Sequence, residues 1–576
     1  MSFDVKDQKE CWDYTQDKMK DLMEQIADDF RVYLGDQYTD KEKSALAKKG
    51  KPSLVINVAK KPCDLLSGFQ RQNWADLSCL PIEGADEVQA DVYTQLFKWI
   101  FSSQNGSHYV SQAFDDAVIC GVGWVAPEIG YDRDLAYGDI RILRESPMSV
   151  MPDPATNNAD LSDCMYILRH AWMSKTRAKS LFPELSDLID KCGMGTSMGE
   201  ENAPRDTRNM VRILENWRKV YSTKKTAMHL LTGEMTDIED DTVLEGQENY
   251  RILDLPTSRI ELFSTINEQE IVYEGENPHG VSRFPLIPVF GYWVPSFPEW
   301  EWRVQGIIRV LKDSQREKNK RRSQLMEAIL SMPHGGWFVE KGSLEDYGPL
   351  RKAGSTSRVV EYNPGKPKPS PIETPPISGA LMELEQLHTA DVRELGLNPD
   401  LLGIVGEKGA PAALGAMRQK QGITAVQMIF DNLAMAKKSL GRYLIDLTRH
   451  NWDNTKVERI IGSMLPFDFA SSGEYYDVAV DELVDSPSYR MANFMVLQQM
   501  AQQGFPIPPE LMIEMAPCSP EMKKKILAGM QAAAGVNPDG SIPPAGAPGE
   551  VPPEIAQMLA GSSGGDITQG QSPTGE

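Results

Sequence analysis

Two short motifs in this sequence match patterns that carry chemistry in other proteins. Residues 195–199, Gly-Thr-Ser-Met-Gly, fit the G-x-S-x-G elbow that presents a nucleophilic serine, here Ser197. The elbow requires a strand before it and a helix after it, whereas both flanks here have the composition of a loop. Residues 121–126, Gly-Val-Gly-Trp-Val-Ala, imitate a dinucleotide-binding G-x-G-x-x-A. They follow a helical pattern and run into Pro127, so we expect a tight turn from a helix into a strand.

Other catalytic signatures are missing from the sequence. It has no G-x-x-x-x-G-K-[ST] loop to hold nucleotide phosphates, and none of its seven histidines begins an H-E-x-x-H motif. Its seven cysteines are scattered without a C-x-x-C pair, which is typical of free thiols in a reducing cytoplasm. The sequence therefore predicts a protein that is not an enzyme and holds no cofactor and no metal.

A basic run is the other candidate for direct chemistry, because cations bind phosphate. It consists of Lys318, Lys320, Arg321 and Arg322. In one interpretation these side chains line a surface that touches nucleic acid. In the other they pair with Asp313 and Glu317 of the same or a neighbouring helix, and the spacing from Glu317 to Arg321 is the favourable one for such a pair. We favour pairing, since such runs usually form solvated helix faces.

The run lies in the element that must position it, a long helix expected at residues 301–330. Its middle, residues 312–324 (KDSQREKNKRRSQ), contains no apolar residue. We therefore expect that this stretch is not buried in the core of its own subunit, and that it either bridges solvent or packs against copies of itself. A proline-dense, strand-containing insert and a second helix from Ser378 to Gly396 follow it.

The rest of the chain divides into helical and strand-like parts. Residues up to about 119 are mainly helical, with Trp12, Met19, Met23 and Ile26 spaced along one face of the first helix. Residues 138–294 have the alternation typical of strands, a long helix is expected to end near His450, and residues 476–480 alternate as a strand. The fold class is therefore α+β and mainly helical.

Composition limits the possible functions. With 576 residues, the chain is expected to form several domains or one elongated subunit. Lys and Arg number 60 against 82 Asp and Glu, a net charge of −22, which argues against gripping nucleic acid through a broad basic surface. No apolar run reaches membrane-spanning length, and the first residues are not those of a signal peptide.

Several stretches, in their order along the chain, resemble the portal proteins of short-tailed bacteriophages. They are residues 51–57 (KPSLVIN), 68–73 (GFQRQN), 114–117 (FDDA), 121–123 (GVG), 146–154 (SPMSVMPDP) and 160–163 (DLSD), then Gly306, Asp313, Gln315 and Asn319, and finally residues 417–422 (MRQKQG) and 476–481 (YDVAVD). None of them is a catalytic signature. For a DNA channel, an acidic chain would let DNA slide, although the same acidity would also simply keep a large protein soluble.

The resemblance implies an elongated subunit of wing, stem, clip and crown that forms a ring, a homododecamer. Its parts would be an N-terminal helical part of the wing (1–137), an α+β wing (138–300), stem helix 1 (301–330), the clip (331–376), stem helix 2 (377–396), a tunnel loop (397–415), a long helix and returning wing strand (416–488), the crown (489–532) and a disordered tail (533–576). Residues 535–576 cannot form the long C-terminal helical barrel of some relatives.

The resemblance also implies partners and sites. The partners are the terminase large subunit, a head-completion or tail adaptor, the major capsid and scaffolding proteins, and double-stranded DNA that passes non-specifically. Lys408 in the tunnel loop joins the basic run as a DNA-facing candidate, although a loop without function remains open, and the clip residues for docking are Trp337, Phe338, Lys366 and Lys368. The location would be the capsid vertex of the virion, after assembly in the host cytoplasm. Two alternatives stay open, another virion protein such as an adaptor or scaffold, and a hydrolase that uses Ser197.

Overall fold

The computed structural model describes residues 3–48, 51–81, 87–191, 209–229, 235–237, 250–331, 337–344, 363–371 and, with short gaps, 424–480. Single residues between 383 and 391 and beyond 496 are also described. The chain divides into two compact units. The first comprises Met1–Arg71 and Asp76–Glu482, and the second comprises Gln72–Ala75 and Leu483–Glu576. All elements below belong to the first unit, except that one helix ends at Gln72.

Helices dominate the N-terminal part, as the sequence predicts. The first helix, α1 (Val5–Leu34), starts at a capping box between Asp4 and Asp7 and ends at Gly35 with φ of 90°. Trp12, Met19 and Ile26 are buried along one face of α1, and Met23 is half-buried beside them. The helices that follow are α2 (Asp40–Lys48), α3 (Lys60–Gln72), α4 (Glu87–Ser103) and α5 (Gly106–Cys120).

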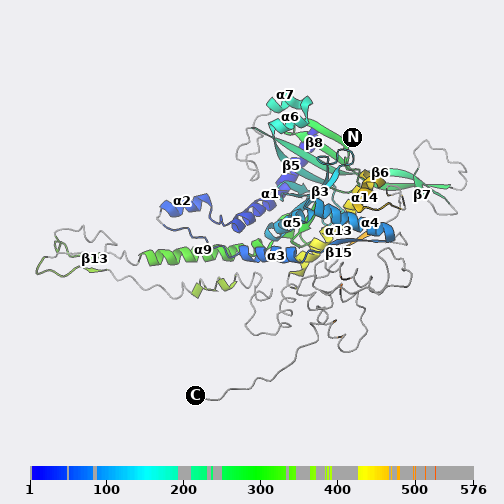
Figure 1. Ribbon diagram of the computed structural model, residues 1–576. Coiled ribbons are helices and arrows are strands. Elements are labelled where there is room, and N and C mark those ends of the chain that lie inside the picture. The colour runs from blue at the N-terminus through cyan, green and yellow to red at the C-terminus, as the bar shows by residue number, and fades with distance from the viewer. Residues whose placement is uncertain are drawn as a thin grey trace, which may run out of the picture. The chain divides into compact units, whose positions relative to one another are not determined.

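The predicted turn after α5 is confirmed. Gly121, with φ of 101°, ends α5, and β2 (Val122–Gly130) begins directly after it. β2 is the central strand of an antiparallel sheet with the order β10-β2-β3, where β3 is Asp139–Glu145 and β10 is Ile287–Phe290. α5 packs against β2 and β3, and α13 (Gln427–Asn451) packs beside β10. Figure 1 shows α5, β3 and α13 in the same region of the molecule. Residues 121–126 therefore form a structural turn and not a dinucleotide loop.

A second antiparallel sheet confirms the strand-rich region. Its strand order is β4-β5-β6-β8-β9, with β7 paired to β6. The strands are β4 (Val150–Pro152), β5 (Tyr166–Ser174), β6 (Met210–His229), β7 (Met235–Asp237), β8 (Tyr250–Ile266) and β9 (Glu270–Glu276). One end is covered by α6 (Lys175–Leu181), η1 (Pro183–Leu185) and α7 (Ser186–Lys191), around a core that includes Ala178, Ile189 and Val211.

The helix expected at residues 301–330 is not continuous, so its predicted start is wrong. A short α8 (Trp300–Arg303) is followed by β12 (Val304–Gln305), which pairs with β11 (Tyr292–Trp293). The long helix, α9 (Ile307–Ser331), begins only after Gly306. A Cβ atom on Gly306 would lie 2.3 Å from the backbone oxygen of Ile119, so the chain there passes against α5 too closely for any other residue.

Beyond α9, the described elements agree with the sequence. The insert contains β13 (Trp337–Phe338) paired with β14 (Ser370–Pro371), so that Pro371 lies in a short two-stranded edge pair. α13 is the long helix expected to end near His450, and it buries an apolar stripe that includes Ile429, Leu440 and Leu444. α14 (Asn454–Ile461) follows, and β15 (Tyr476–Val480) pairs with β1 (Leu77–Pro81). None of the described helices is long and apolar enough to cross a membrane.

Several predictions lie outside the described residues. They concern the serine motif at 195–199, the loop at 397–415 with Lys408, the segment 489–532 apart from single residues, and the tail 533–576. The second helix after the insert is described only at single residues between 383 and 391, which are helical.

Candidate functional site

One face of the polar middle of α9 is buried in its own subunit, so the prediction that this stretch could not be buried there is wrong. Gln315 has no exposed surface, Asn319 is 1% exposed and Lys318 is 5% exposed. These residues lie on the same helix face as the buried Ile308 and Leu311. The buried face of α9 therefore extends along the helix beyond Leu311, with hydrogen-bonding side chains in place of apolar ones.

Backbone groups of an extended segment at residues 54–59 bury this face. Gln315 Oε1 accepts hydrogen bonds from the backbone N–H groups of Val58 at 3.0 Å and Ala59 at 3.1 Å, and its Nε2 donates to the Ile56 oxygen at 2.7 Å. Asn319 Oδ1 accepts from the Ile56 N–H at 3.0 Å. A segment without strand neighbours must satisfy its backbone groups through side chains, which explains why polar residues are required on α9.

Two carboxylates near the end of α1 bind the cations on the first turns of α9. Asp29, whose side chain is fully buried, accepts from Arg309 at 2.8 Å and from Lys312 at 3.2 Å. Asp28 accepts from Lys312 at 3.1 Å and from Arg316 at 2.6 Å. Burial raises the pKa of Asp29 although both cations act to lower it, so the cations are needed to keep this carboxyl charged.

The sequence reasoning missed these acidic partners and the buried face. A signal for them was present, because Arg309, Lys312 and Arg316 are spaced by three and four residues and therefore share one helix face. A row of cations on a face that also carries buried apolar residues requires carboxylates opposite it. The adjacent Asp28 and Asp29, on the last turns of a predicted helix, were available for that role.

For the basic run, pairing within the helix is confirmed at two of the four positions. Lys320 lies 3.2 Å and Arg321 lies 3.4 Å from the carboxylate of Glu317, while Asp313 takes part in no ion pair with a described residue. Arg322 is exposed and Lys318 is buried. On the outward face of α9, Glu317 therefore pairs with two of the four cations.

The insert displays some of the predicted docking residues at its surface. Phe338 is 65% exposed on β13, and Lys368 is exposed near β14. The ammonium group of Lys366 donates to the backbone oxygen of Lys341 at 2.8 Å, which joins the turn after β13 to the segment before β14. Trp337 belongs to β13, and its side chain lies outside the described residues. An exposed phenylalanine beside cations is a surface that suits a protein partner.

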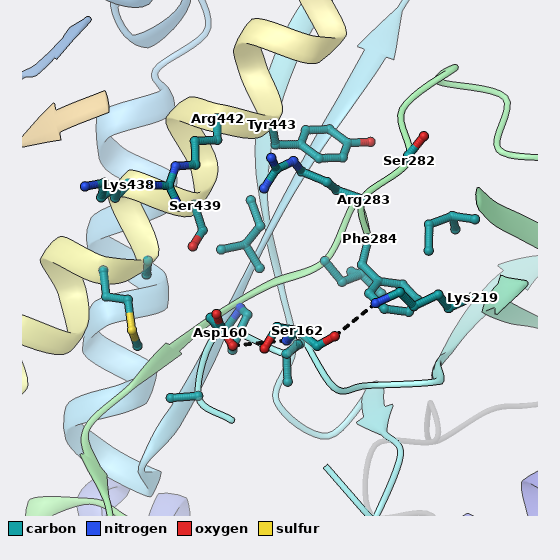
Figure 2. Close-up of a pocket in the computed structure, with 18 residues that line it drawn as sticks. Asp160, Ser162, Lys219, Ser282, Arg283, Phe284, Lys438, Ser439, Arg442 and Tyr443 are labelled. Carbon is teal, nitrogen blue, oxygen red and sulfur yellow. Dashed lines mark hydrogen bonds between the residues drawn. The ribbon is translucent and has the colours of Figure 1, made fainter. Parts of the chain in front are cut away.

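A pocket of about 360 Å³ lies between α13, the segment 282–288 and the loop at 159–162. Figure 2 shows Lys438, Ser439 and Arg442 projecting from α13 on one side, with Asp160 and Ser162 opposite. Its cations already have partners, because Lys438 and Arg442 each lie 2.9 Å from Asp477. Lys219 donates to the Ser162 oxygen at 3.0 Å. None of the residues proposed from the sequence lines this pocket.

No group of His, Cys, Asp and Glu in the described part of the chain could hold a metal ion. Burial raises the pKa of the thiol groups of Cys63 and Cys120, so these cysteines stay protonated and unreactive. In the described part of the chain, α9 therefore carries buried structural contacts, and the insert carries an exposed aromatic side chain.

Comparisons with known proteins point to one family. The sequence model of the family described as "Phage P22-like portal protein" matches residues 9–558. No curated protein matches the chain. A chain from a solved structure described as "Neck of empty GTA particle computed with C6 symmetry" is similar, with 11% identity and a TM-score of 0.33 over 82% of this chain and 92% of that one. At such a TM-score the structural likeness carries no argument, so the family match decides the assignment.

Proposed function

Because the chain belongs to the phage P22-like portal protein family, we propose that its copies close into a ring whose channel passes double-stranded DNA at one vertex of the capsid. The match over residues 9–558 is the observation that carries this proposal. The chain is a portal protein of the bacteriophage head–tail connection and thus a component of the virion. Its role is to conduct the genome during packaging and again during ejection.

The subunit has surfaces that assembly would cover. α2 has no buried residue in its own subunit. On α9, Met326 is 39% exposed and Ile329 is 46% exposed, and both continue the helix face on which Leu311 and Gln315 are buried. Apolar side chains on a helix face favour packing against another helix, so we assign the last turns of α9 to a contact between neighbouring stem helices.

The polar middle of α9 is no argument for the ring, because its own subunit buries one face of it. Ring formation can be tested directly on the purified protein. The purified chain at micromolar concentration should elute as a large oligomer in size-exclusion chromatography with light scattering, and negative-stain electron microscopy should show closed rings with a central hole. Twelve subunits are expected from the resemblance. A folded chain that remains monomeric at these concentrations would exclude the proposal.

We assign the insert the role of the clip, the docking surface for the terminase large subunit and then for a head-completion or tail adaptor. The exposed Phe338 and Lys368 support this assignment. The prolines of residues 364–371 restrict the unbound segment, which lowers the entropy lost when a partner binds. The wing would face the major capsid and scaffolding proteins.

Replacement of residues 342–376 by a short Gly/Ser linker tests the clip. Rings should still form, while terminase should no longer be retained in a pull-down and packaging should stop. If the deletion prevents ring formation, the insert is a clamp between subunits. Rings that form normally and still bind terminase would refute both roles. A Phe338→Ser variant is the milder form of the same test.

We also propose that the chain lacks ATPase activity and that DNA meets few cations in the channel. The DNA-facing candidates are Lys408, Lys320, Arg321 and Arg322, whereas the buried Lys318 is not carried forward. Rings with Lys408→Gln should assemble normally and change the rate at which a terminase motor packages DNA. ATP turnover by rings free of terminase would contradict the non-enzymatic role.

A further inference from the structure

The six-stranded sheet has a hydrophobic core of its own. α6 and α7 pack with β6 and β8 around a cluster of buried residues that includes Ile189, Val211 and Ile266. We call residues 150–276, which contain this sheet, α6, η1 and α7, the sheet body, and its contacts with α1, β3 and α13 the seam. A body with its own core can move as a unit when the contacts around it are weak.

The first half of α1 meets the sheet body mainly through polar side chains. Gln8, Trp12 and Thr15 are the buried residues in this half. Gln8 Nε2 donates to the Leu214 oxygen at 3.2 Å, and the hydroxyl groups of Thr15 and Tyr166 share a hydrogen bond of 2.9 Å. The second half of α1 buries mainly apolar residues instead. The packing of the helix thus changes from apolar to polar where it enters the seam.

Two buried amide groups in this part of the seam lack hydrogen bonds. Gln8 is 1% exposed and Asn216 has no exposed surface. No group of the described residues donates a hydrogen bond to Gln8 Oε1 or to Asn216 Oδ1. The Nδ2 of Asn216 reaches the Cys11 Sγ at 3.9 Å, which is a long contact. A buried polar atom without a partner costs stability, so Asn216 weakens the closed seam.

Charged side chains hold the middle of the seam. Arg169 of β5 lies 2.8 Å from Glu145 of β3 and 3.5 Å from Glu215 of β6. Glu145 belongs to the other side of the seam, whereas Glu215 belongs to the sheet body itself. Arg169 therefore keeps a carboxylate partner within the sheet body when its contact with Glu145 opens, which avoids a buried charge without a partner.

The seam is loosely packed on its α13 side. The pocket of about 360 Å³ in Figure 2 has Leu161, Lys219 and Ile260 of the sheet body on one wall, and residues 282–288 with α13 on the other. Protein interiors are normally close-packed. A pocket along the seam therefore leaves room for its two sides to change their separation.

A clamp from α8 fixes the sheet body at the connection between β4 and β5. The guanidinium of Arg303, which is 1% exposed, donates to the Thr156 oxygen and, at 3.0 Å, to Asn157 Oδ1. Beside it, Trp300 Nε1 donates to the Pro154 oxygen at 3.2 Å. Motion of the sheet body would therefore pivot at this clamp.

We propose that the sheet body rotates about the α8 clamp, which opens and closes the seam, and that Asn216 keeps the seam able to open. α1 and α9 stay together through the buried ion pairs of Asp29, so the motion leaves the long helix in place. In the proposed ring, on which the role of this motion rests, each sheet body would adjust to its capsid and scaffolding partners while α9 keeps its position.

Asn216→Val tests the unpartnered amide. Valine is close to asparagine in shape, favours a strand and removes both buried polar atoms. The midpoint of thermal unfolding, measured by circular dichroism, should therefore rise by about 2 °C. A midpoint that stays the same or falls would show that the amide has a stabilising role, for instance through a bound water molecule, and would overturn the proposal.

The thiol of Cys11 reports opening, because it lies beside Asn216 in the seam. In the open seam water reaches the amide, so asparagine favours opening and valine does not. Alkylation of Cys11 by N-ethylmaleimide, followed by peptide mass spectrometry, should therefore slow by about fivefold or more in Asn216→Val. The matched control is Gly68→Ala in α3, outside the seam, which should leave the rate unchanged. Equal rates in wild type and Asn216→Val would overturn the motion.

A disulfide across the seam tests whether the motion serves packaging. Asn216→Cys places a second thiol beside Cys11, and oxidised glutathione takes up the two electrons when the disulfide forms. Rings with this disulfide should assemble normally but package DNA more slowly by roughly tenfold or more, and dithiothreitol should restore the rate. The control disulfide is Tyr221→Cys with Ser258→Cys, two positions that lie opposite each other within the sheet body, and it should leave packaging unchanged. Equal rates before and after reduction of Asn216→Cys would overturn this role.

The results separate the motion from the proposed function. If the wild-type chain forms no rings, the proposed function fails, while the melting and alkylation experiments still decide the motion. If wild-type rings package DNA and Cys11 is alkylated at the same rate in every variant, only the motion is wrong.

Discussion

The side-chain amide of Gln315 acts as the strand partner that Val58 lacks, accepting its backbone N–H at 3.0 Å across 257 residues of sequence. The same amide accepts from Ala59 and donates to Ile56, so one side chain satisfies three backbone groups. The attachment of the N-terminal segment to α9 therefore depends on an uncharged polar residue in a stretch with no apolar residues.

We predict that Gln315→Leu lowers the free energy of unfolding by about 3 kcal/mol, because it leaves buried backbone groups without partners. Chemical denaturation at fixed protein concentration measures the change. The control is Gln324→Leu on the same helix, whose amide contacts Arg321 at 3.0 Å, and it should change stability by no more than about 0.5 kcal/mol. Equal losses in the two variants would contradict this role for Gln315.

The neighbouring carboxylates Asp28 and Asp29 should differ sharply in their contribution. Asp29→Ala leaves the cations of Arg309 and Lys312 without their buried partner, so we expect a loss of about 3–5 kcal/mol. Asp28 is one-third exposed and binds the exposed Arg316, so Asp28→Ala should cost no more than about 1 kcal/mol. Denaturation of the two single variants in the same buffer checks the order. Similar losses would show that burial does not determine how much each carboxylate contributes to the free energy of unfolding.

The sequence predicted the elements better than their environment. Periodicity located α1, α13 and the strand-rich region, because spacing along a face is a local property of the chain. The same local rule failed for α9, since it counts only apolar residues. What buries Gln315 and Asn319 is the backbone of residues 54–59, a partner that no local pattern reveals.

The prediction for the basic run shows the same limit. The cations at 320 and 321 and their partner Glu317 lie within one helical turn, so spacing sufficed to predict their pairing. The acidic partners of Arg309 and Lys312 come from α1, hundreds of residues earlier, and their contact depends on the tertiary fold. The break at Gly306 likewise depends on how closely α5 approaches, which the residues of the helix do not encode.

Two glycine-to-alanine changes should have opposite effects on stability. At Gly306 a Cβ atom would meet the Ile119 backbone oxygen at 2.3 Å, so Gly306→Ala should destabilise the protein by about 1–3 kcal/mol. At Gly68, inside α3, a Cβ atom would meet nothing within 4 Å. Gly68→Ala should stabilise the protein by about 0.5–1 kcal/mol, because alanine favours the helix. Thermal melting of both variants decides, and a stabilising Gly306→Ala would show that β12 can move away from α5.

The last prediction concerns acid stability and rests on His279. Its Nδ1 shares a hydrogen bond of 2.9 Å with the Tyr443 hydroxyl of α13, which joins the end of the large sheet to that helix. Burial, with a smaller effect of Arg169, lowers the pKa of His279 from 6.5 to about 4. Between these values the unfolded chain binds a proton that the folded chain does not. The free energy of unfolding should therefore fall as the pH drops from 6.5 to 4, by at most about 3 kcal/mol from this group.

In His279→Gln that part of the pH dependence should disappear, whereas His108→Gln, at an exposed position on α5, should keep it. Denaturation curves between pH 4 and 8 measure the slopes, and parallel slopes for wild type and His279→Gln would show that His279 is not held neutral.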